Sequence, residues 1–394
     1  MKKSTIAISC AYPRPDEYGA LAVPIYNNVS FEFKDAQEMS DVFTNKVKAP
    51  EYARIANPTV TNFEQRVKEL TDASHVTAYN SGMAAISNIL LSVASQGKNI
   101  VTSHHLFGNT LALISGTLLR FGVKPKLRDL TKVEEVAEAI DAQTACVFLE
   151  TVTNPQLEVA DLRLLAEIAH KKGVPLIADS TVIPFTESSL KELGVDFEVV
   201  SSTKYISGGG TSLGGLVIDY GAFPQVGKRI KQEVLVNIGA YMTPYAAYMQ
   251  TLGLETLEVR YRQQASSALW LAERLRKVSG IAKVNYVGLE DNPFHELAQK
   301  QFGPTAGAML TIDLTSKEEC FRFLNNLRLI HRATNLFDNR TLAIHPASTI
   351  FGLFQKRQLE QMDVRDTTIR LSVGLEDRQD LLADIEQALK PNET

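Results

Sequence analysis

The chain has 394 residues, of which 44% are hydrophobic and 22% charged, ordinary values for a globular protein. Its 41 lysines and arginines nearly balance 45 acidic residues, so we expect no nucleic-acid partner. The three cysteines, Cys10, Cys146 and Cys320, lack the spacing of a disulfide framework or a zinc site, so we expect no metal. No apolar run reaches the ~20 residues that span a bilayer, and no secretion signal follows the first methionine. We therefore expect a cytoplasmic protein that contacts no membrane.

The N-terminal part of the chain differs from the rest in its prolines and in its lack of a regular hydrophobic pattern. Residues 1–60 contain five prolines and no regular hydrophobic period, which predicts an extended arm that contacts a neighbouring subunit. Thr61 and Glu64 have the spacing of a capping box, so a helix is predicted to begin there. A second helix is predicted to open at Ser81 and Gly82, directly after a strand.

Between residues 74 and 220, β-rich runs alternate with helical stretches, as is typical of a parallel sheet with crossover helices. The predicted strands are 75–79, 99–103, 124–127, 145–150, 175–179 and 197–201. We expect one large α/β domain over residues 61–245. The pattern then changes to a long helix near 255–277 and strands near 308–314 and 368–372, which predicts an α+β domain over residues 246–394.

Three features near predicted strand ends together suit pyridoxal phosphate. Lys204 lies among small hydroxyl residues before a glycine-rich turn, a setting that suits an amine reaching a bulky ligand. Asp179 ends an apolar strand, where it could bind a protonated pyridine nitrogen or simply cap a helix. Ser81-Gly82-Met83 opens a helix that could bind phosphate, although such a start is usually only a cap. Each feature alone favours the plainer explanation, but the three together supply every attachment that this cofactor needs.

These and further motifs resemble the cystathionine γ-synthase-like family of pyridoxal-phosphate enzymes, also called the Cys/Met metabolism family, over essentially the full length. Further matches are Tyr52-x-Arg54, the segment from Glu150 to Pro155, and the motifs that begin at His345 and Arg370. The resemblance implies an α/β protein of fold type I, with a mainly parallel seven-stranded sheet flanked by helices and a smaller C-terminal α+β domain. It also implies a homotetramer built as a dimer of dimers.

The resemblance assigns roles to single residues. Those implied to bind the cofactor are Tyr52, Arg54, Ser81, Gly82, Met83, Phe107, Asn154, Asp179, Thr181, Ser201, Thr203 and Lys204, and those implied to bind the substrate are Asn335 and Arg370. Lys204 is the implied catalytic residue, which holds the cofactor as an imine and removes the substrate α-proton. Arg370 would bind the α-carboxylate, for which a guanidinium is well shaped. Tyr52 and Arg54 would reach the cofactor phosphate of the adjacent subunit.

Several positions resemble the O-acetylhomoserine sulfhydrylase branch. Asn335 stands where many relatives carry serine, and Arg340 where many carry glutamate. Two positions depart from the family: Phe107 replaces a tyrosine, and Ser180 replaces an asparagine. A phenyl ring cannot exchange a proton, so the substrate is expected to carry a good leaving group such as acetate.

The predicted reaction is γ-replacement on O-acetylhomoserine by a sulfur nucleophile to give homocysteine, a step of methionine biosynthesis. Free sulfide, methanethiol or a protein-borne sulfur would each fit as the donor. Alternatives are a cystathionine γ-synthase, a methionine or cystathionine γ-lyase, and a protein that binds pyridoxal phosphate without turnover.

Overall fold

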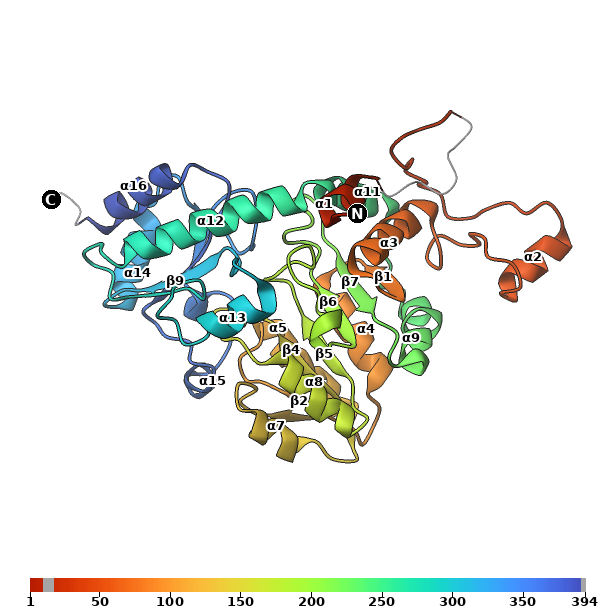
Figure 1. Ribbon diagram of the computed structural model, residues 1–394, viewed down its shortest axis with the longest axis horizontal. Helices are drawn as coiled ribbons and strands as arrows, with labels where there is room; N and C mark the ends of the chain where they lie inside the picture. Colours follow the sequence, from red (N-terminus) through yellow and green to blue (C-terminus); the bar gives the residue numbers. More distant parts are fainter. Residues whose placement is uncertain (10–17, 391–394) are drawn as a thin grey trace.

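The computed structural model describes residues 1–9 and 18–390, so Cys10 lies outside the described residues. The described residues form a seven-stranded and a five-stranded sheet, each covered by helices. Figure 1 draws the larger sheet near the middle of the molecule and the smaller one toward the C-terminus. Cys146 and Cys320 are buried and unbridged.

The larger sheet is mainly parallel, as predicted. Its strands in chain order are β1 (His75–Tyr79), β2 (Asn99–Thr102), β3 (Lys124–Leu127), β4 (Thr144–Glu150), β5 (Leu176–Asp179), β6 (Phe197–Val200) and β7 (Gly215–Asp219). Their spatial order is β1-β7-β6-β5-β4-β2-β3, and β7 runs antiparallel to both of its neighbours. The parallel strands β4, β5 and β6 therefore present their carboxyl ends at one edge of the sheet.

Both faces of this sheet are covered, which explains why its central strands are mainly apolar. Leu176 and Ala178 of β5 pack into one hydrophobic cluster, and Ile177 between them packs into another on the opposite face. Such alternation follows from the pleat, which sends successive side chains to opposite faces. The helices that follow the strands supply the covering layers.

The helices are α1 (Lys3–Ser9), α2 (Ala36–Phe43), α3 (Pro58–Thr71), α4 (Gly82–Val93), α5 (Gly108–Ala112), α6 (Leu118–Arg120), α7 (Val133–Ala139), α8 (Leu162–Lys171), α9 (Pro224–Arg229), α10 (Val236–Ile238), α11 (Pro244–Glu255), α12 (Leu257–Leu275), α13 (His295–Phe302), α14 (Lys317–Asn326), α15 (Lys356–Gln361) and α16 (Arg378–Leu389). Figure 1 shows α12 running from the larger sheet toward the smaller one. Among the described residues, no helix has both the length and the apolar character that crossing a membrane requires.

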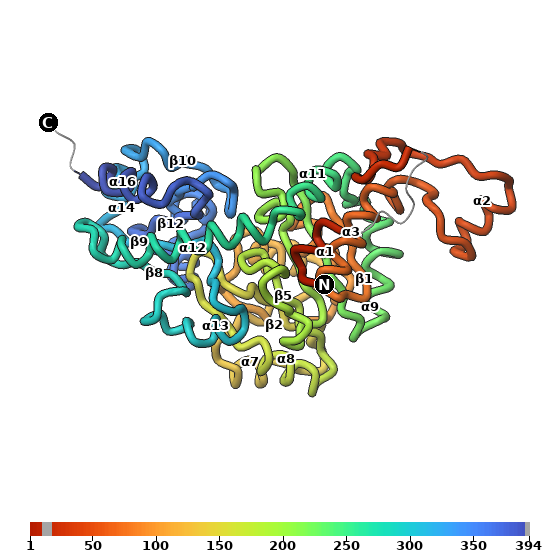
Figure 2. The backbone as a smooth tube through the Cα atoms, turned by 45° about the horizontal axis from the view of Figure 1, so that its top comes forward, coloured from red at the N-terminus to blue at the C-terminus, as the bar shows by residue number. Residues whose placement is uncertain are grey.

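The smaller sheet has the order β10-β11-β12-β9-β8. Its strands are β8 (Lys283–Asn285), β9 (Met309–Asp313), β10 (His331–Arg332), β11 (Leu342–Ile344) and β12 (Thr368–Ser372). The central strand β12 is antiparallel to β11 and β9, and it carries Arg370. Helices α14 and α16 lie against each other beside this sheet (Figure 2).

The N-terminal segment is less extended than its prolines predict. Two short helices, α1 and α2, interrupt it, and Figure 2 shows α2 on a long excursion away from the sheets. Helix α1 instead lies on the body of the molecule, because Arg66 of α3 donates to the Ala7 carbonyl over 2.9 Å. Proline spacing predicts where extended chain occurs, but it does not reveal one- or two-turn helices between the prolines.

The predicted start of α3 at Thr61 is wrong. The helix begins at Pro58, and the side chain of Asn57 caps it by accepting from the Thr59 N–H at 3.0 Å. Asparagine followed by proline at the first helical position is a stronger start signal than the Thr61–Glu64 pair. Glu64 serves a tertiary contact instead, since its carboxylate accepts from the Ala78 N–H over 2.9 Å.

Replacing Asn57 should therefore weaken the fold, whereas replacing Thr61 should not. Asn57→Ala removes the cap and a 2.8 Å hydrogen bond to the Tyr26 carbonyl, and we expect a loss of about 1–2 kcal/mol in the free energy of unfolding. Thr61→Ala, at an exposed helical position, should change that free energy by less than about 0.5 kcal/mol. Denaturant unfolding of both variants tests this, and equal losses would contradict the assigned cap.

Candidate active site

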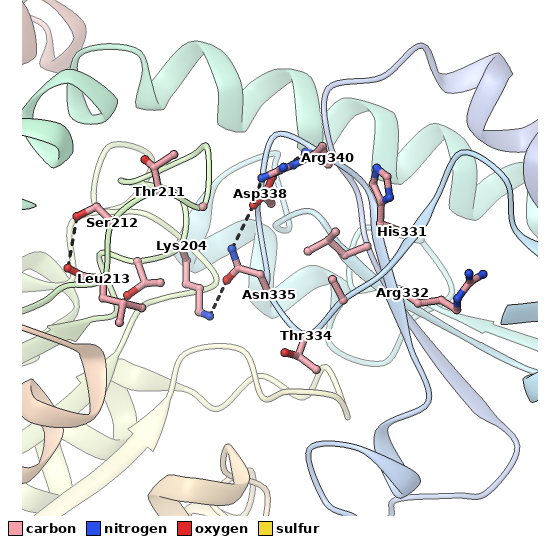
Figure 3. A pocket seen from close by; sticks show the side chains of 14 residues that line it. Lys204, Thr211, Ser212, Leu213, His331, Arg332, Thr334, Asn335, Asp338 and Arg340 are labelled. Atoms are coloured by element: carbon pink, nitrogen blue, oxygen red, sulfur yellow. Dashed lines mark hydrogen bonds and ion pairs between the residues drawn. The ribbon is translucent and has the colours of Figure 1, made fainter. Parts of the chain in front are cut away.

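Several of the predicted site residues lie at the carboxyl edge of β4, β5 and β6. Glu150 and Asp179 end neighbouring strands and lie opposite each other in register. Beyond β6 the chain continues to Lys204, which lines a cavity of about 760 Å³. Figure 3 shows that Asn335 and Thr334 face Lys204 across this cavity, from the segment between β10 and β11. The larger sheet and the C-terminal part of the chain thus both contribute walls.

Lys204 is held by an amide from the opposite wall. Its Nζ donates to Asn335 Oδ1 over 2.9 Å (Figure 3). Burial lowers the pKa of Lys204 to about 8, and the positive charge of Arg370 acts in the same direction. A lysine with this pKa has an appreciable neutral fraction near neutrality, which a nucleophilic or basic amine requires.

Arg370 is buried to 2% exposure in the middle of β12. Its Nη1 donates to Asn154 Oδ1 over 3.0 Å, and its Nη2 donates to the Asn335 carbonyl over 3.3 Å. Its Nε is buried and has no hydrogen-bond partner within the described part of the chain. A buried guanidinium with an unused donor suits an anionic ligand such as a carboxylate.

Asp179 is placed by two hydrogen bonds that cross the loops at this edge. Its Oδ1 accepts from the Thr181 N–H over 2.9 Å, and Thr181 Oγ1 in turn accepts from the Ser201 N–H over 2.8 Å. Burial raises the pKa of Asp179. Because burial disfavours the ionised carboxylate, a cation beside it, such as a protonated pyridine nitrogen, would stabilise that ionised form.

The start of α4 provides the donors that a phosphate needs. Ser81 caps the helix, with its Oγ accepting from the Ala84 N–H over 3.1 Å. The N–H groups of Gly82 and Met83, earlier in the first turn, have no partner within the helix. A Cβ at Gly82 would lie 2.7 Å from Ser201 Cβ and Oγ, so only glycine lets the helix start and Ser201 approach so closely. Met83 follows in the same turn and is half-buried.

Thr203 differs from the other predicted phosphate residues. Its hydroxyl accepts from the Gly214 N–H over 3.0 Å and donates to the Gly214 carbonyl over 3.1 Å. This hydroxyl is therefore engaged with the backbone, and it ties the Lys204 segment to the strand that follows. The remaining donors, at the first turn of α4 and on Ser201, fit the chemistry of a phosphate group.

Phe107 precedes α5 and is placed through its backbone. Its N–H donates to Glu150 Oε1 over 2.6 Å. Burial and, to a smaller extent, the nearby Asp179 charge raise the pKa of Glu150 to about 8. No role was predicted for Glu150 from the sequence. A polar residue at the end of an apolar strand, beside the strand that ends in Asp179, was the available signal.

Asp338 was also not predicted from the sequence as a site residue. Its carboxylate holds the Asn335 side chain in place. Asp338 Oδ2 accepts from Asn335 Nδ2 over 3.3 Å, and Asp338 Oδ1 pairs with Arg340 Nε over 2.8 Å (Figure 3). Arg340 also donates to the Gly209 carbonyl over 3.0 Å. Asp338 is almost wholly buried, so this arrangement fixes the amide that contacts Lys204.

Tyr52 and Arg54 are not among the residues that line the Lys204 cavity. The Arg54 guanidinium lies 5.5 Å from the centre of the Tyr52 ring and donates to the Val236 carbonyl. Tyr52 is 40% exposed. Their predicted contact with the cofactor of a neighbouring subunit stays a prediction.

The chain matches the family model described as Cys/Met metabolism PLP-dependent enzyme over residues 4–390. The chain belongs to this family. It is 37% identical to an L-methionine gamma-lyase of Fusobacterium nucleatum subsp. nucleatum, with 99% of each chain covered. It is 35% identical to an O-succinylhomoserine sulfhydrylase of Pseudomonas aeruginosa, with 98% of this chain and 94% of that protein covered.

A solved structure agrees with the same assignment. An O-acetylhomoserine (thiol)-lyase of Campylobacter jejuni subsp. jejuni is 31% identical, has a TM-score of 0.95, and covers 99% of this chain and 100% of its own. That structure contains a pyridoxyl group joined to a lysine. The present protein is thus a pyridoxal-phosphate enzyme of the transferase or lyase type, which confirms the predicted family, fold and cofactor.

The described residues fit this cofactor. When bound, pyridoxal phosphate supplies an electron sink for charge that develops at the substrate α-carbon. Lys204 would hold it covalently, Asp179 would pair with its ring nitrogen, and the first turn of α4 would bind its phosphate. The unpartnered Nε of Arg370 and the neutral fraction of Lys204 remain available for a substrate anion and a substrate proton.

The lowered pKa of Lys204 predicts how cofactor uptake depends on pH. Only the neutral amine attacks an aldehyde, so the rate at which apoprotein binds pyridoxal phosphate should rise about tenfold per pH unit below 8 and level off above it. Stopped-flow absorbance would follow the reaction, with free lysine in the same buffers correcting for ionisation of the cofactor. Lys204→Ala should show no covalently bound chromophore at any pH. A rate that keeps rising about tenfold per pH unit from pH 8 to pH 10, as for a lysine with the ordinary pKa, would contradict the lowered pKa.

Proposed function

We propose that this enzyme catalyses γ-replacement on an O-acylated homoserine, with O-acetylhomoserine as the substrate and a sulfur nucleophile giving homocysteine, as a step of methionine biosynthesis. The proposal rests on the phenyl side chain of Phe107, which has no proton to donate. Its backbone is fixed by Glu150 beside Asp179, but its side chain has no titratable group. The residue at this place therefore cannot give a proton to a departing γ-substituent.

The absence of a donor at residue 107 separates leaving groups by their basicity. An acyl ester leaves as a carboxylate, whose conjugate acid has a pKa near that of Asp or Glu, about 4. A thioether leaves as a thiolate, whose conjugate acid has a pKa of about 8.5 or higher. The carboxylate departs without help, whereas the thiolate benefits from a general acid. An O-acyl ester is therefore the better substrate for this site.

The other site residues have roles that suit any γ-substituted amino acid. Arg370 would bind the α-carboxylate, and Asn154 and Asn335 would orient it through their contacts with the guanidinium. Lys204 would remove the α-proton, since its lowered pKa leaves part of the amine neutral. These residues define an amino-acid site but do not distinguish replacement from elimination.

The same proposal includes the assembly. Tyr52 and Arg54 would complete the site of a neighbouring subunit, in a homotetramer built as a dimer of dimers. The parts of each subunit would be the arm (1–60), the cofactor domain (61–245) and the C-terminal domain (246–394), and the enzyme would act in the cytoplasm.

A γ-lyase is the second candidate, because an L-methionine gamma-lyase is among the relatives at 37% identity. A cystathionine γ-synthase would use the same residues with cysteine as the nucleophile. A substrate panel on the purified holoenzyme separates these functions. We expect homocysteine from O-acetylhomoserine only when sulfide or another sulfur donor is present. Release of 2-oxobutanoate and ammonia from methionine at a comparable rate would instead establish the lyase.

Restoring a phenol at residue 107 tests the reason for this choice. Phe107→Tyr should raise elimination from methionine by at least about tenfold, because general acid catalysis typically contributes 10²–10⁴-fold. Its rate with O-acetylhomoserine and sulfide should change less than about threefold. Phe107→Leu, the matched control without a phenol, should raise neither rate. An unchanged methionine rate in Phe107→Tyr would contradict the leaving-group argument.

A further inference from the structure

Glu198 is a wholly buried carboxyl group in β6, outside the cavity that contains Lys204. Its Oε1 accepts from the Ser180 hydroxyl, and its Oε2 accepts from the Tyr220 hydroxyl at 2.5 Å. Ser180 directly follows Asp179 at the end of β5, and Tyr220 directly follows β7. The carboxylate thus connects residues at the ends of two strands that flank its own.

Strand register places Glu198 behind the Asp179 carboxylate. Asp179 is opposite Val199 in β6, and Glu198 is opposite Ala178. Because successive side chains of a strand leave on opposite faces, Glu198 and Asp179 point to opposite sides of the sheet from neighbouring strands. The two acids are near enough that the charge of Asp179 raises the pKa of Glu198.

The charges around Glu198 come from several elements. Lys3 of α1 is the cation whose charge lowers the pKa of Glu198, and its ammonium donates to the Phe185 carbonyl. Lys3 is in turn influenced by the acids Glu187, Glu192 and Glu258. Burial outweighs the hydroxyl donors and Lys3, and it raises the pKa of Glu198 to about 7. The group therefore changes its charge near neutral pH.

We propose that Glu198 is a positioning residue for the cofactor: through Ser180 it fixes the strand end that carries Asp179, and its charge reinforces that of Asp179. Ser180 is held on both sides, since its N–H donates to the Val199 carbonyl over 2.9 Å while its hydroxyl donates to Glu198. Asp179 is the residue immediately before this anchored serine. Any movement of Ser180 would therefore move the carboxylate that pairs with the ring nitrogen.

This pairing also accounts for one departure from the family pattern. Ser180 stands where the family usually has asparagine, a difference that the sequence alone left without a reason. The structure supplies the reason, because the short hydroxyl of Ser180 donates directly to a buried acid on the neighbouring strand. Ser180 and Glu198 thus form one unit, with Tyr220 as its second donor.

A negative charge behind Asp179 favours the protonated form of a nearby ring nitrogen or cofactor–lysine adduct. Removing that charge should weaken cofactor binding and make the bound chromophore lose its proton at lower pH. With an effective dielectric constant of ~20, a unit charge about 12 Å from the titrating group shifts such a titration by about one pH unit. The inference rests on cofactor attachment at Lys204 and not on the choice of substrate, so it can fail while the proposed reaction stands.

The test is Glu198→Gln in the holoenzyme without substrate. This change keeps the shape of the side chain but removes its charge at every pH. We expect the titration midpoint of the bound chromophore, followed by absorbance, to fall by about one pH unit. The dissociation constant for pyridoxal phosphate, measured on apoprotein, should rise about tenfold. An unchanged midpoint together with an unchanged dissociation constant would overturn the proposal.

Asp196→Asn is the matched control. Asp196 is also a buried acid, just before β6 at the opposite end of these strands. It accepts from the Leu176 N–H over 2.8 Å and contacts His170 over 2.9 Å. Its amide variant should lower the unfolding temperature without moving the chromophore titration. An equal shift in this control would reduce Glu198 to a structural role and so overturn the proposal.

Tyr220→Phe provides a second measurement if Glu198→Gln does not fold. Losing one donor to the carboxylate removes a hydrogen bond that favours the charged form, so the pKa of Glu198 should rise further. Glu198 would then carry less negative charge at a given pH, so the titration midpoint of the bound chromophore should fall, in the same direction as in Glu198→Gln but by less. A midpoint that stays in place or rises would contradict the role of Glu198.

Discussion

The hydrogen bond between Arg370 and Asn154 joins the two sheets at the active site. Arg370 comes from the centre of β12, and Asn154 from the loop that follows β4. A buried guanidinium is costly to desolvate unless its donors are paired. Arg370 therefore depends on the Asn154 side chain and the Asn335 backbone carbonyl, which accept from its two terminal nitrogens. One donor is nevertheless left without a partner among the described residues. The fold therefore holds a cation with an unused donor, and the carboxylate of an amino-acid substrate would complete its hydrogen bonds.

The charges of the site separate into two sides. Lys204 and Arg370 form the cationic side, and burial lowers the pKa of each. Glu150, Asp179 and Glu198, on three successive strands of the larger sheet, form the acidic side, and burial raises the pKa of each. The protonated ring nitrogen of the cofactor would be complementary to the acidic side, and a substrate carboxylate would be complementary to Arg370 on the cationic side. Their binding would relieve part of the desolvation cost that each side carries alone.

Much of the larger sheet could be predicted because its strands are short apolar runs that end in polar residues. The bounds of β1 and β3 match the prediction, and the other predicted strands differ by a residue at one end. The cap at Ser81 was also predictable, because it follows a strand directly. The predicted helix start at Thr61 was wrong because two helix-start signals lie within five residues of each other. The Asn57–Pro58 signal has the better local geometry and sets the start of α3.

The residues that hold the site side chains in place could not be predicted from local sequence patterns. Glu198 lies in an otherwise apolar strand, and its partners are 18 and 22 residues away in the sequence. Asp338 is recognisable only once the segment between β10 and β11 is known to face Lys204. Such residues act through tertiary contacts, so neither propensity nor periodicity identifies them. Family motifs predict which residues would contact the cofactor, and the structure identifies the neighbours that hold those residues in place.

Phe107 illustrates how a site of this kind can change its chemistry without changing its shape. The backbone of residue 107 is fixed by Glu150, whatever side chain it carries. The next residue, Gly108, is packed so closely that a Cβ there would lie 3.0 Å from the Ile350 carbonyl oxygen and 3.4 Å from the Phe351 ring. The position of the aromatic ring is therefore set by its neighbours, and exchange of phenol for phenyl alters only the supply of protons. Leaving-group preference can then differ between relatives that share the same cofactor contacts.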